Sequence, residues 1–166
     1  MNGRRVLPQS DRQRESRLDP GHLLAGAQSA RSQPLESAAA IARALVAAPQ
    51  DVDVRLAAYR FYFFTHDYAR ALDQAQVLLG FAARRLNLPP DWRLVSPEDA
   101  AFTAHDFAPG LYLQVLIAMG YCLARLGQVD PACEVLAQAA RLDPSDRFGG
   151  AWLRDNILRA ALPDED

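Results

Sequence analysis

The chain has 166 residues, half of them apolar, and a formal net charge of −2 at pH 7. This length and composition suit one small domain with a single hydrophobic core. The nearly balanced charge excludes nucleic-acid binding driven by bulk electrostatics, and two cysteines are too few for a disulfide scaffold.

The N-terminal segment differs from the rest of the chain in charge. Residues 1–34 hold six arginines against three acidic residues, whereas the remainder is net acidic. Gly, Pro, Ser and Gln recur in residues 1–17 without an apolar core pattern, so we predict a disordered Arg-rich tail there. No apolar stretch follows Arg4-Arg5, so an export signal is not expected.

Residues 18–51 open the predicted helical domain. The apolar spacing predicts a helix at Leu35–Ala48. The preceding part, residues 19–31, stays undecided because Gly21 and Gly26 each weaken a helix by up to about 1 kcal/mol relative to alanine.

Residues 52–86 are predicted to form two helices joined by a turn at His66-Asp67, where Asp67 suits the cap of the second helix. The stretch at residues 59–68 holds six of the fourteen aromatic residues. At helical spacing these rings point to two sides. Either both sides pack inside the fold, or Phe63 and Phe64 stay partly exposed.

The segment 87–110 separates the two helical stretches and reads as a long insert, with Asp106 as a suitable cap for a helix near Pro109. Pro89-Pro90 stops the preceding helix, and we expect Trp92, Phe102 and Phe107 to anchor the loop. A loop of this length is often functional, either as a lid over a neighbouring surface or as a second contact site. His105 with nearby acids is the one candidate for a metal or acid–base site, but no second histidine at helical spacing supports it.

Residues 113–146 carry the clearest helix-turn-helix pattern. Gly127 suits the left-handed end of the first helix, and Asp130 and Pro131 suit the cap and first turn of the second. Gly120 and Ala132 are small where two antiparallel helices would come close. Cys122 and Cys133 lie on the two helices at no zinc-binding spacing, so we expect free buried thiols.

The chain is predicted to end with a lone helix at residues 147–161, followed by an acidic tail at 162–166. The helix would cover the last apolar face of the domain. Its predicted buried side consists of Phe148, Trp152, Leu153 and Ile157.

Residues 113–146 resemble the tetratricopeptide repeat (TPR), a 34-residue helix pair. The matching slots are Leu116, Met119, Gly120, Leu123, Ala132, Leu136, Ala139 and Pro144. By the same spacing, residues 52–86 and 18–51 resemble two degenerate copies, with Arg55 and Tyr59 as departures in the former. The resemblance implies an all-α fold, a short TPR-like α-solenoid of antiparallel helix pairs with a C-terminal capping helix.

The resemblance also implies where a partner would bind. In TPR arrays the first helix of each repeat lines a concave groove. The groove positions in this sequence would be Arg60, Phe63, Phe64, Gln114, Ile117, Tyr121 and Arg125. Aromatic residues and arginine are frequent in binding hot spots, so we expect a partner peptide or amphipathic helix with apolar anchors and some acidic residues.

No phosphate-binding loop, nucleophile elbow or HExxH motif is present, so we predict no enzyme, no cofactor and no metal. The apolar stretch Leu111–Leu126 is broken by Gln114 and Arg125, which favours a buried helix over a membrane span. We expect a cytoplasmic adaptor or assembly factor that binds another protein and no nucleic acid. The alternatives are a dedicated secretion-type chaperone of one client and a structural homo-oligomer subunit; the oligomeric state is open.

Overall fold

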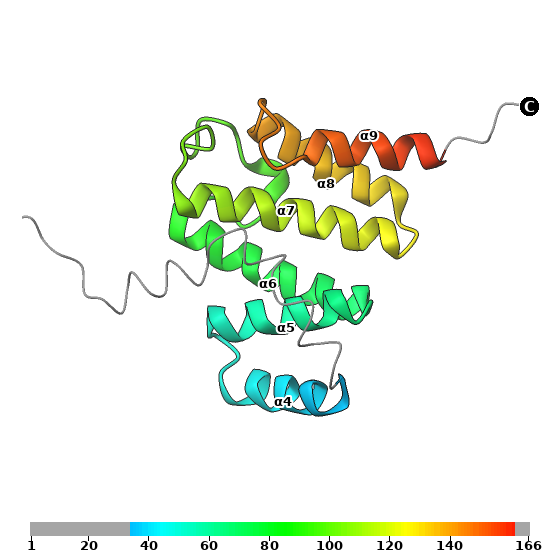
Figure 1. Ribbon diagram of the computed structural model, residues 1–166. Coiled ribbons are helices and arrows are strands. Elements are labelled where there is room, and N and C mark those ends of the chain that lie inside the picture. Colours follow the sequence, from blue (N-terminus) through cyan, green and yellow to red (C-terminus); the bar gives the residue numbers. More distant parts are fainter. Residues whose placement is uncertain (1–33, 162–166) are drawn as a thin grey trace, which may run out of the picture.

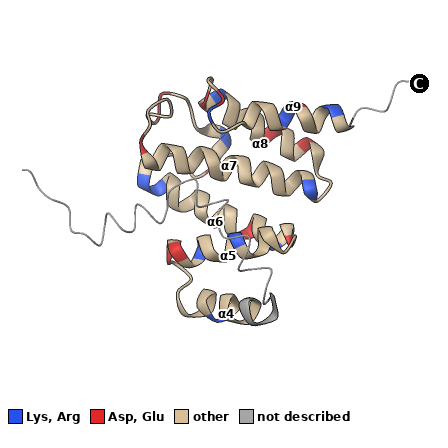
Figure 2. Cartoon of the chain, in the orientation of Figure 1, with Lys and Arg blue, Asp and Glu red and all other residues tan. Residues whose placement is uncertain are grey.

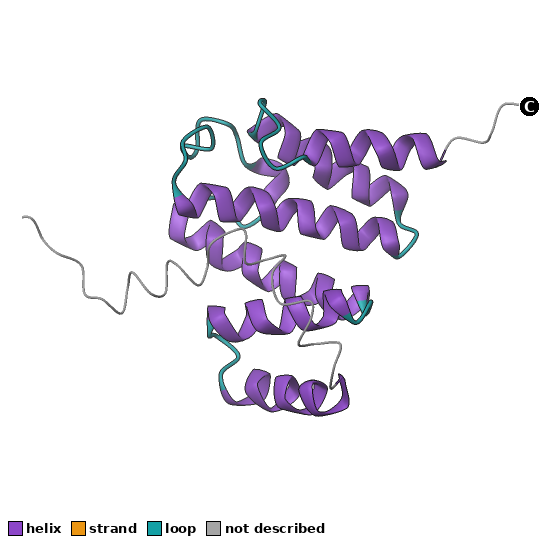
Figure 3. Cartoon of the chain, viewed as in Figure 1, coloured by secondary structure: helices purple, strands orange, loops and turns teal. Residues whose placement is uncertain are grey.

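The computed structural model describes residues 34–161 of the protein (Figure 1). The predictions for the tail 1–17, for residues 18–33 and for the acidic tail 162–166 lie outside the described residues. Within 34–161 the regular structure is entirely helical, without strands (Figure 3). The all-α prediction is therefore confirmed for this part of the chain.

The helices begin and end close to the predicted positions, and α6 reaches Leu86 as expected. In chain order they are α4 (Pro34–Ala47), α5 (Val52–Phe64), α6 (Tyr68–Leu86), the 3-10 helix η1 (Trp92–Leu94), α7 (Phe107–Arg125), α8 (Val129–Leu142) and α9 (Gly150–Ala161).

Each α-helix packs against the next one along the chain, and α7 also contacts α9. In Figure 1, α5, α7 and α9 run in one direction and α4, α6 and α8 in the other. Short turns return the chain beside the preceding helix after α4, α5 and α7. The long insert joins α6 to α7 in the same antiparallel manner. The core lies between α6, α7 and α8, where Leu78, Leu113 and Leu136 are fully buried.

Glycine at position 120 allows α7 and α8 to approach closely. A Cβ atom there would lie only 2.6 Å from Cδ2 of Leu136 on α8. Ala132 of α8 is completely buried in the same interface. The predicted close approach of these two helices is thus present, with Leu136 as the side chain that fills the space above Gly120.

The helix ends follow local sequence, with one correction. Asp51 and Asp67 accept hydrogen bonds from the first turns of α5 and α6, and Gly127 adopts a left-handed φ of 76° after α7. The prediction that Asp130 caps α8 is wrong, because α8 begins at Val129 with Gln128 as its cap residue. Asp130 lies inside the first turn, where its charge favours the helix dipole.

A second correction concerns α9. Leu153 and Ile157 pack against the core, as does Phe148 before the helix. Trp152, however, is 65% exposed. Gly150, Leu153 and Ile157 repeat at three and four residues and form the buried stripe, so the residue before Leu153 faces outward.

The predicted insert 87–110 is too long at its C-terminal end, because α7 already begins at Phe107. Phe102 is buried as predicted, and Trp92 and Phe107 are partly buried against the core. The insert also contains η1 and buries Leu88 and Val95. It packs on α8 rather than over α5, so the expectation of a lid over the predicted groove finds no support in this arrangement.

Among the described helices, α7 is long and apolar enough to cross a membrane by length and composition alone, and 56% of that stretch is buried inside the fold. Its neighbours α6, α8 and α9 cover it. The core helix of a soluble protein has the same combination of hydropathy and burial.

Candidate functional site

The seven residues predicted to face a partner lie on α5 and α7, and none belongs to the fully buried core. We refer to them as the α5–α7 face: Arg60, Phe63, Phe64, Gln114, Ile117, Tyr121 and Arg125. The spacings of three and four residues place each subset on one side of its helix. Phe63 links the two helices, since its ring centroid lies 5.3 Å from that of Tyr121.

A cluster of rings surrounds Phe63. Its centroid lies 5.6 Å from Tyr59, 5.4 Å from Phe64 and 6.0 Å from Tyr68. Ring pairs at these distances stabilise a fold beyond their simple burial, by about 1 kcal/mol each. Phe63 therefore supports the packing of α5 on α6 and α7, whereas Phe64, with a single close ring neighbour, lies at the edge of the cluster.

Arg125 closes the cluster at the C-terminal end of α7. Its guanidinium carbon lies 4.7 Å from the ring centroid of Tyr68, and its Nη1 donates a hydrogen bond to the hydroxyl of Tyr121 at 3.0 Å. This hydrogen bond is the main cause of a raised Arg125 pKa. Arg125 makes no ion pair with a carboxylate of the described chain, so its charge remains available to an anion.

Two further residues of this cluster were not among the predicted site residues. Tyr68, the first residue of α6, is buried, and its hydroxyl lies 2.7 Å from Nδ1 of His66. Burial raises the pKa of Tyr68, which keeps its hydroxyl neutral. The left-handed φ of 62° at His66 brings the imidazole back toward this hydroxyl. A turn residue in that conformation is hard to foresee from sequence.

Arg60 lies one turn before Phe63 on α5 and is half-buried. Its Nε and Nη2 atoms are buried and have no hydrogen-bond partner. Burial lowers the Arg60 pKa, and the charge of Asp53, two turns earlier on the same side of α5, opposes that effect. No ion pair joins Arg60 to Asp53.

Gln114 and Ile117 extend the face along α7, and both are half-buried. Ile117 lies beside α9, since a Cβ on Gly150 would be 3.3 Å from its Cγ1 atom. Ile117 therefore belongs to the α7–α9 contact, whereas Phe63 and Tyr121 join α5 to α7 and Arg125 joins α7 to Tyr68 of α6. The structure thus brings four of the seven residues into one cluster: Phe63, Phe64, Tyr121 and Arg125.

Reactive groups beneath this face are held in neutral form. Burial raises the pKa of the Cys122 thiol to about 12 and raises the pKa of Tyr59 as well. Thiol nucleophiles need a lowered pKa, so Cys122 behaves as an apolar core residue. Within residues 34–161 no group of three or more His, Cys, Asp or Glu side chains could hold a metal ion.

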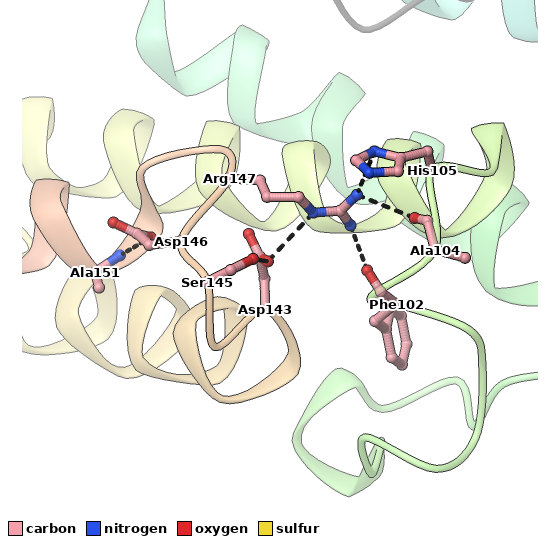
Figure 4. Close-up of polar contacts among 8 residues, drawn as sticks. All are labelled: Phe102, Ala104, His105, Asp143, Ser145, Asp146, Arg147 and Ala151. Carbon is pink, nitrogen blue, oxygen red and sulfur yellow. Dashed lines mark hydrogen bonds and ion pairs between the residues drawn. The ribbon is translucent and has the colours of Figure 1, made fainter.

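On the opposite side of the domain, Arg147 holds the end of the insert (Figure 4). Its Nη1 donates to the carbonyl oxygen of Ala104 at 3.0 Å and lies 3.2 Å from Nδ1 of His105, and its Nη2 donates to the carbonyl oxygen of Phe102. Asp143, only 4% exposed, forms an ion pair with the Nε atom at 3.5 Å. His105 of the insert thus has Arg147 as a structural partner.

Side chains from α8 hold the start of the insert. Gln138 donates to the carbonyl oxygens of Trp92 and Val95, both at 2.8 Å. Arg141 donates to the same Val95 carbonyl at 2.6 Å. We call Gln138, Arg141 and Arg147 the insert clamp. An open hollow of about 310 Å³ lies beside it, between η1 and α8.

Basic and acidic positions are interspersed over the described helices and loops (Figure 2). The two arginines of the α5–α7 face are therefore local features, which suits recognition of individual acidic groups more than attraction of a polyanion.

Comparison with known proteins places the chain in a family. It is 33% identical over 125 residues to a protein of Azotobacter chroococcum mcd 1 named "Uncharacterized 19.8 kDa protein in nifW 5'region", and the match covers 74% of this chain and 67% of that protein. The chain belongs to the family of that protein. No protein-family model matches the chain, and no solved structure matches it.

Proposed function

We propose that the chain is a TPR-like helical repeat protein without enzymatic activity that binds another protein through the α5–α7 face. In this proposal α5 with α6 and α7 with α8 are successive repeats, and α9 closes the array. The contacts between consecutive helices and the spacing of the repeat positions in residues 113–146 support this assignment.

One observation carries the binding role. Half-buried rings on α5 and α7 lie between two arginines that have no carboxylate partner in the described chain. Aromatic and arginine side chains dominate protein-binding hot spots. A peptide or an amphipathic helix is the form of partner that a helical surface of this width accommodates.

We further propose that the protein acts in the bacterial cytoplasm as an adaptor or assembly factor. The burial of α7 inside the fold supports a soluble protein, and the Azotobacter relative supports a bacterial setting. The relative's name refers to the 5′ region of nifW, so the nifW product is the first individual protein to test as a partner.

The test is affinity capture of the tagged protein from cells that contain it, followed by mass spectrometry. The face variant is Phe64→Ala with Arg125→Glu, chosen because Phe64 lies at the edge of the ring cluster and Phe63 at its centre. The matched control is Phe81→Ala with Arg84→Glu, a stacked pair on α6 with 4.8 Å between the guanidinium carbon and the ring centroid.

We expect the wild type and the control to recover the same stoichiometric partner, and the face variant to lose it while keeping its helicity by circular dichroism. Undiminished capture by a folded face variant would contradict the proposal. Recovery of the chain alone, as a defined oligomer, would favour a structural subunit instead.

A further inference from the structure

The guanidinium of Arg60 differs from the other half-buried arginines of residues 38–161. Arg55, on the same helix, donates from Nε to the carbonyl oxygen of Pro49 and from Nη1 to the side chain of Gln74. Arg147 and Arg154 each form an ion pair. Only Arg60 in this set has buried N–H groups, at Nε and Nη2, without an acceptor.

Buried donors without acceptors are unfavourable, and a charged donor more so than a neutral one. A guanidinium presents pairs of parallel N–H groups that fit the two oxygens of a carboxylate. Asp53 is the nearby acid, but it makes no ion pair with Arg60. The unsatisfied Nε and Nη2 atoms therefore lack the acceptor that their geometry best suits.

Arg60 lies next to the apolar part of the face, so an acceptor bound to it would lie there too. Phe63 and Phe64 follow Arg60 by three and four residues and are its neighbours on the helix surface. Tyr121 precedes Arg125 by one turn and contacts Phe63. Because α5 and α7 run in the same direction, the two arginines lie on opposite sides of the ring pair, about two helical turns or roughly 11 Å apart along the axis.

We infer that the partner bound by this face is an acidic–apolar segment of another protein, in which a side-chain carboxylate binds the guanidinium of Arg60 and a neighbouring apolar side chain packs on Phe64. Binding requires the half-buried Arg60 side chain to turn outward, so that the buried Nε and Nη2 atoms meet the carboxylate. A second acidic residue of the segment lies near Arg125. Side-chain carboxylates fit better than a chain-terminal one, because a segment that continues across the ring pair meets both cations. This inference rests on the proposed binding role of the face.

The first test uses the free protein. Replacement of Arg60 by methionine keeps an unbranched apolar side chain and removes the unsatisfied donors, so Arg60→Met leaves the thermal midpoint unchanged or raises it. Arg55→Met on the same helix removes the donors of two hydrogen bonds, to Pro49 and Gln74, and lowers the midpoint. Equal losses for the two variants would show that Arg60 is satisfied in the free fold and would overturn the inference.

The second test adds a carboxylate probe. We expect 3-phenylpropionate, which joins a carboxylate to a ring, to shift the Arg60 Nε–Hε signal in NMR spectra saturably. Its amide, 3-phenylpropionamide, has the same ring without the charge and produces no such shift. The absence of a shift with the acid, or equal shifts with acid and amide, would overturn the inference.

Partner capture separates this inference from the proposed function. Loss of one charge-assisted contact weakens binding by about tenfold or more, so Arg60→Met reduces capture strongly while Arg43→Met, an exposed arginine on α4, does not. If Arg60→Met captures the partner normally and the Phe64 and Arg125 variant does not, the face binds protein without a carboxylate at Arg60. If none of the variants affects capture, the proposed function itself fails.

Discussion

Arginine has opposite roles on the two sides of this small domain. In the insert clamp, Arg141 and Arg147 donate to backbone carbonyls of the insert, and Arg147 also pairs with a buried carboxylate. On the α5–α7 face, Arg60 has buried donors without acceptors and Arg125 rests on tyrosine rings. The arginines of the insert clamp have acceptors within the fold, whereas those of the α5–α7 face have no carboxylate partner among the described residues.

The presence or absence of acceptors, rather than exposure, therefore distinguishes the structural arginines from those proposed to bind a partner. Arg60 and Arg147 are both half-buried, so burial alone would treat them alike. A satisfied guanidinium contributes to the fold, and its removal leaves buried oxygens without donors. An unsatisfied guanidinium contributes little to the fold, and its removal affects binding only. Mutation of residues on each side tests this contrast.

The largest effect is expected for Arg147→Met. The substitution removes the donors for the carbonyls of Phe102 and Ala104 and leaves the carboxylate of Asp143, 4% exposed, without its cation. We expect a loss of about 2–4 kcal/mol in the free energy of unfolding, measured by urea denaturation. The control Arg154→Met removes a pair with its own neighbour Asp155 and changes stability little. A loss below about 1 kcal/mol for Arg147→Met would contradict the clamp.

A smaller effect is expected for Gln138→Leu, which keeps the size of the side chain. The carbonyl oxygen of Trp92 loses its shorter hydrogen bond and keeps only that from the Val95 N–H at 3.3 Å, whereas the carbonyl of Val95 keeps Arg141. We expect a loss of about 1–2 kcal/mol and faster proteolysis within residues 87–106. Gln76→Leu, at an exposed position on α6, is the control. Unchanged proteolysis would show that apolar contacts alone hold the insert.

The sequence predicted the helices better than the insert because the two depend on different information. Leu116 and Gly120 lie four residues apart, as do Ala132 and Leu136, and this helical spacing on each side of the turn defines the α7–α8 pair. The insert depends on Gln138 and Arg147, which bind backbone carbonyls more than forty residues away. Side chain–backbone bonds of that range leave no local pattern in a sequence.

The candidate site was predictable in part for the same reason. The TPR resemblance implied that Phe63, Tyr121 and Arg125 share one surface, and the structure brings them together. It could not reveal that Tyr68 supports Arg125, since that contact crosses from α6 to α7. Trp152 was misplaced because Phe148 lies before the first residue of α9, so the four-residue step from Phe148 to Trp152 is not a helical one.

On the α5–α7 face, Arg125→Met is expected to leave the thermal midpoint nearly unchanged. Its guanidinium is exposed and makes cation–π contacts with Tyr68 and Tyr121 and one hydrogen bond to a hydroxyl, and such contacts contribute little in water. Thermal unfolding of the variant measures this. A loss comparable to that of Arg147→Met would mean that the face is a structural element, which would remove the contrast between the two sides.

The smallest effect concerns the thiol beneath the face. Burial raises the pKa of Cys122 to about 12 from an ordinary value of 9, so at pH between these values the folded chain keeps a proton that the unfolded chain releases. Stability from this group is complete below about pH 9 and declines as pH rises toward 12. The expected loss at pH 9.5 is less than about 1 kcal/mol.

The contribution of the Cys122 thiol is measured by comparing wild type and Cys122→Ala. Urea midpoints are determined for both proteins at about pH 7.5 and about pH 9.5. The stability of the variant declines less, because its unfolded chain has one thiol fewer to ionise. Buried tyrosines such as Tyr112, whose pKa is raised to about 12, contribute equally to the decline of both proteins.

Thiol labelling is a second measurement of the same region. Cys133 on α8 is partly exposed and reacts first with a thiol reagent, whereas labelling of the buried Cys122 requires local opening of the fold. Equal declines in the two proteins, or equal labelling of the two thiols, would mean that α5 separates from α7 readily. The rings around Phe63 would then be too mobile to present Arg60 and Arg125 as fixed sites.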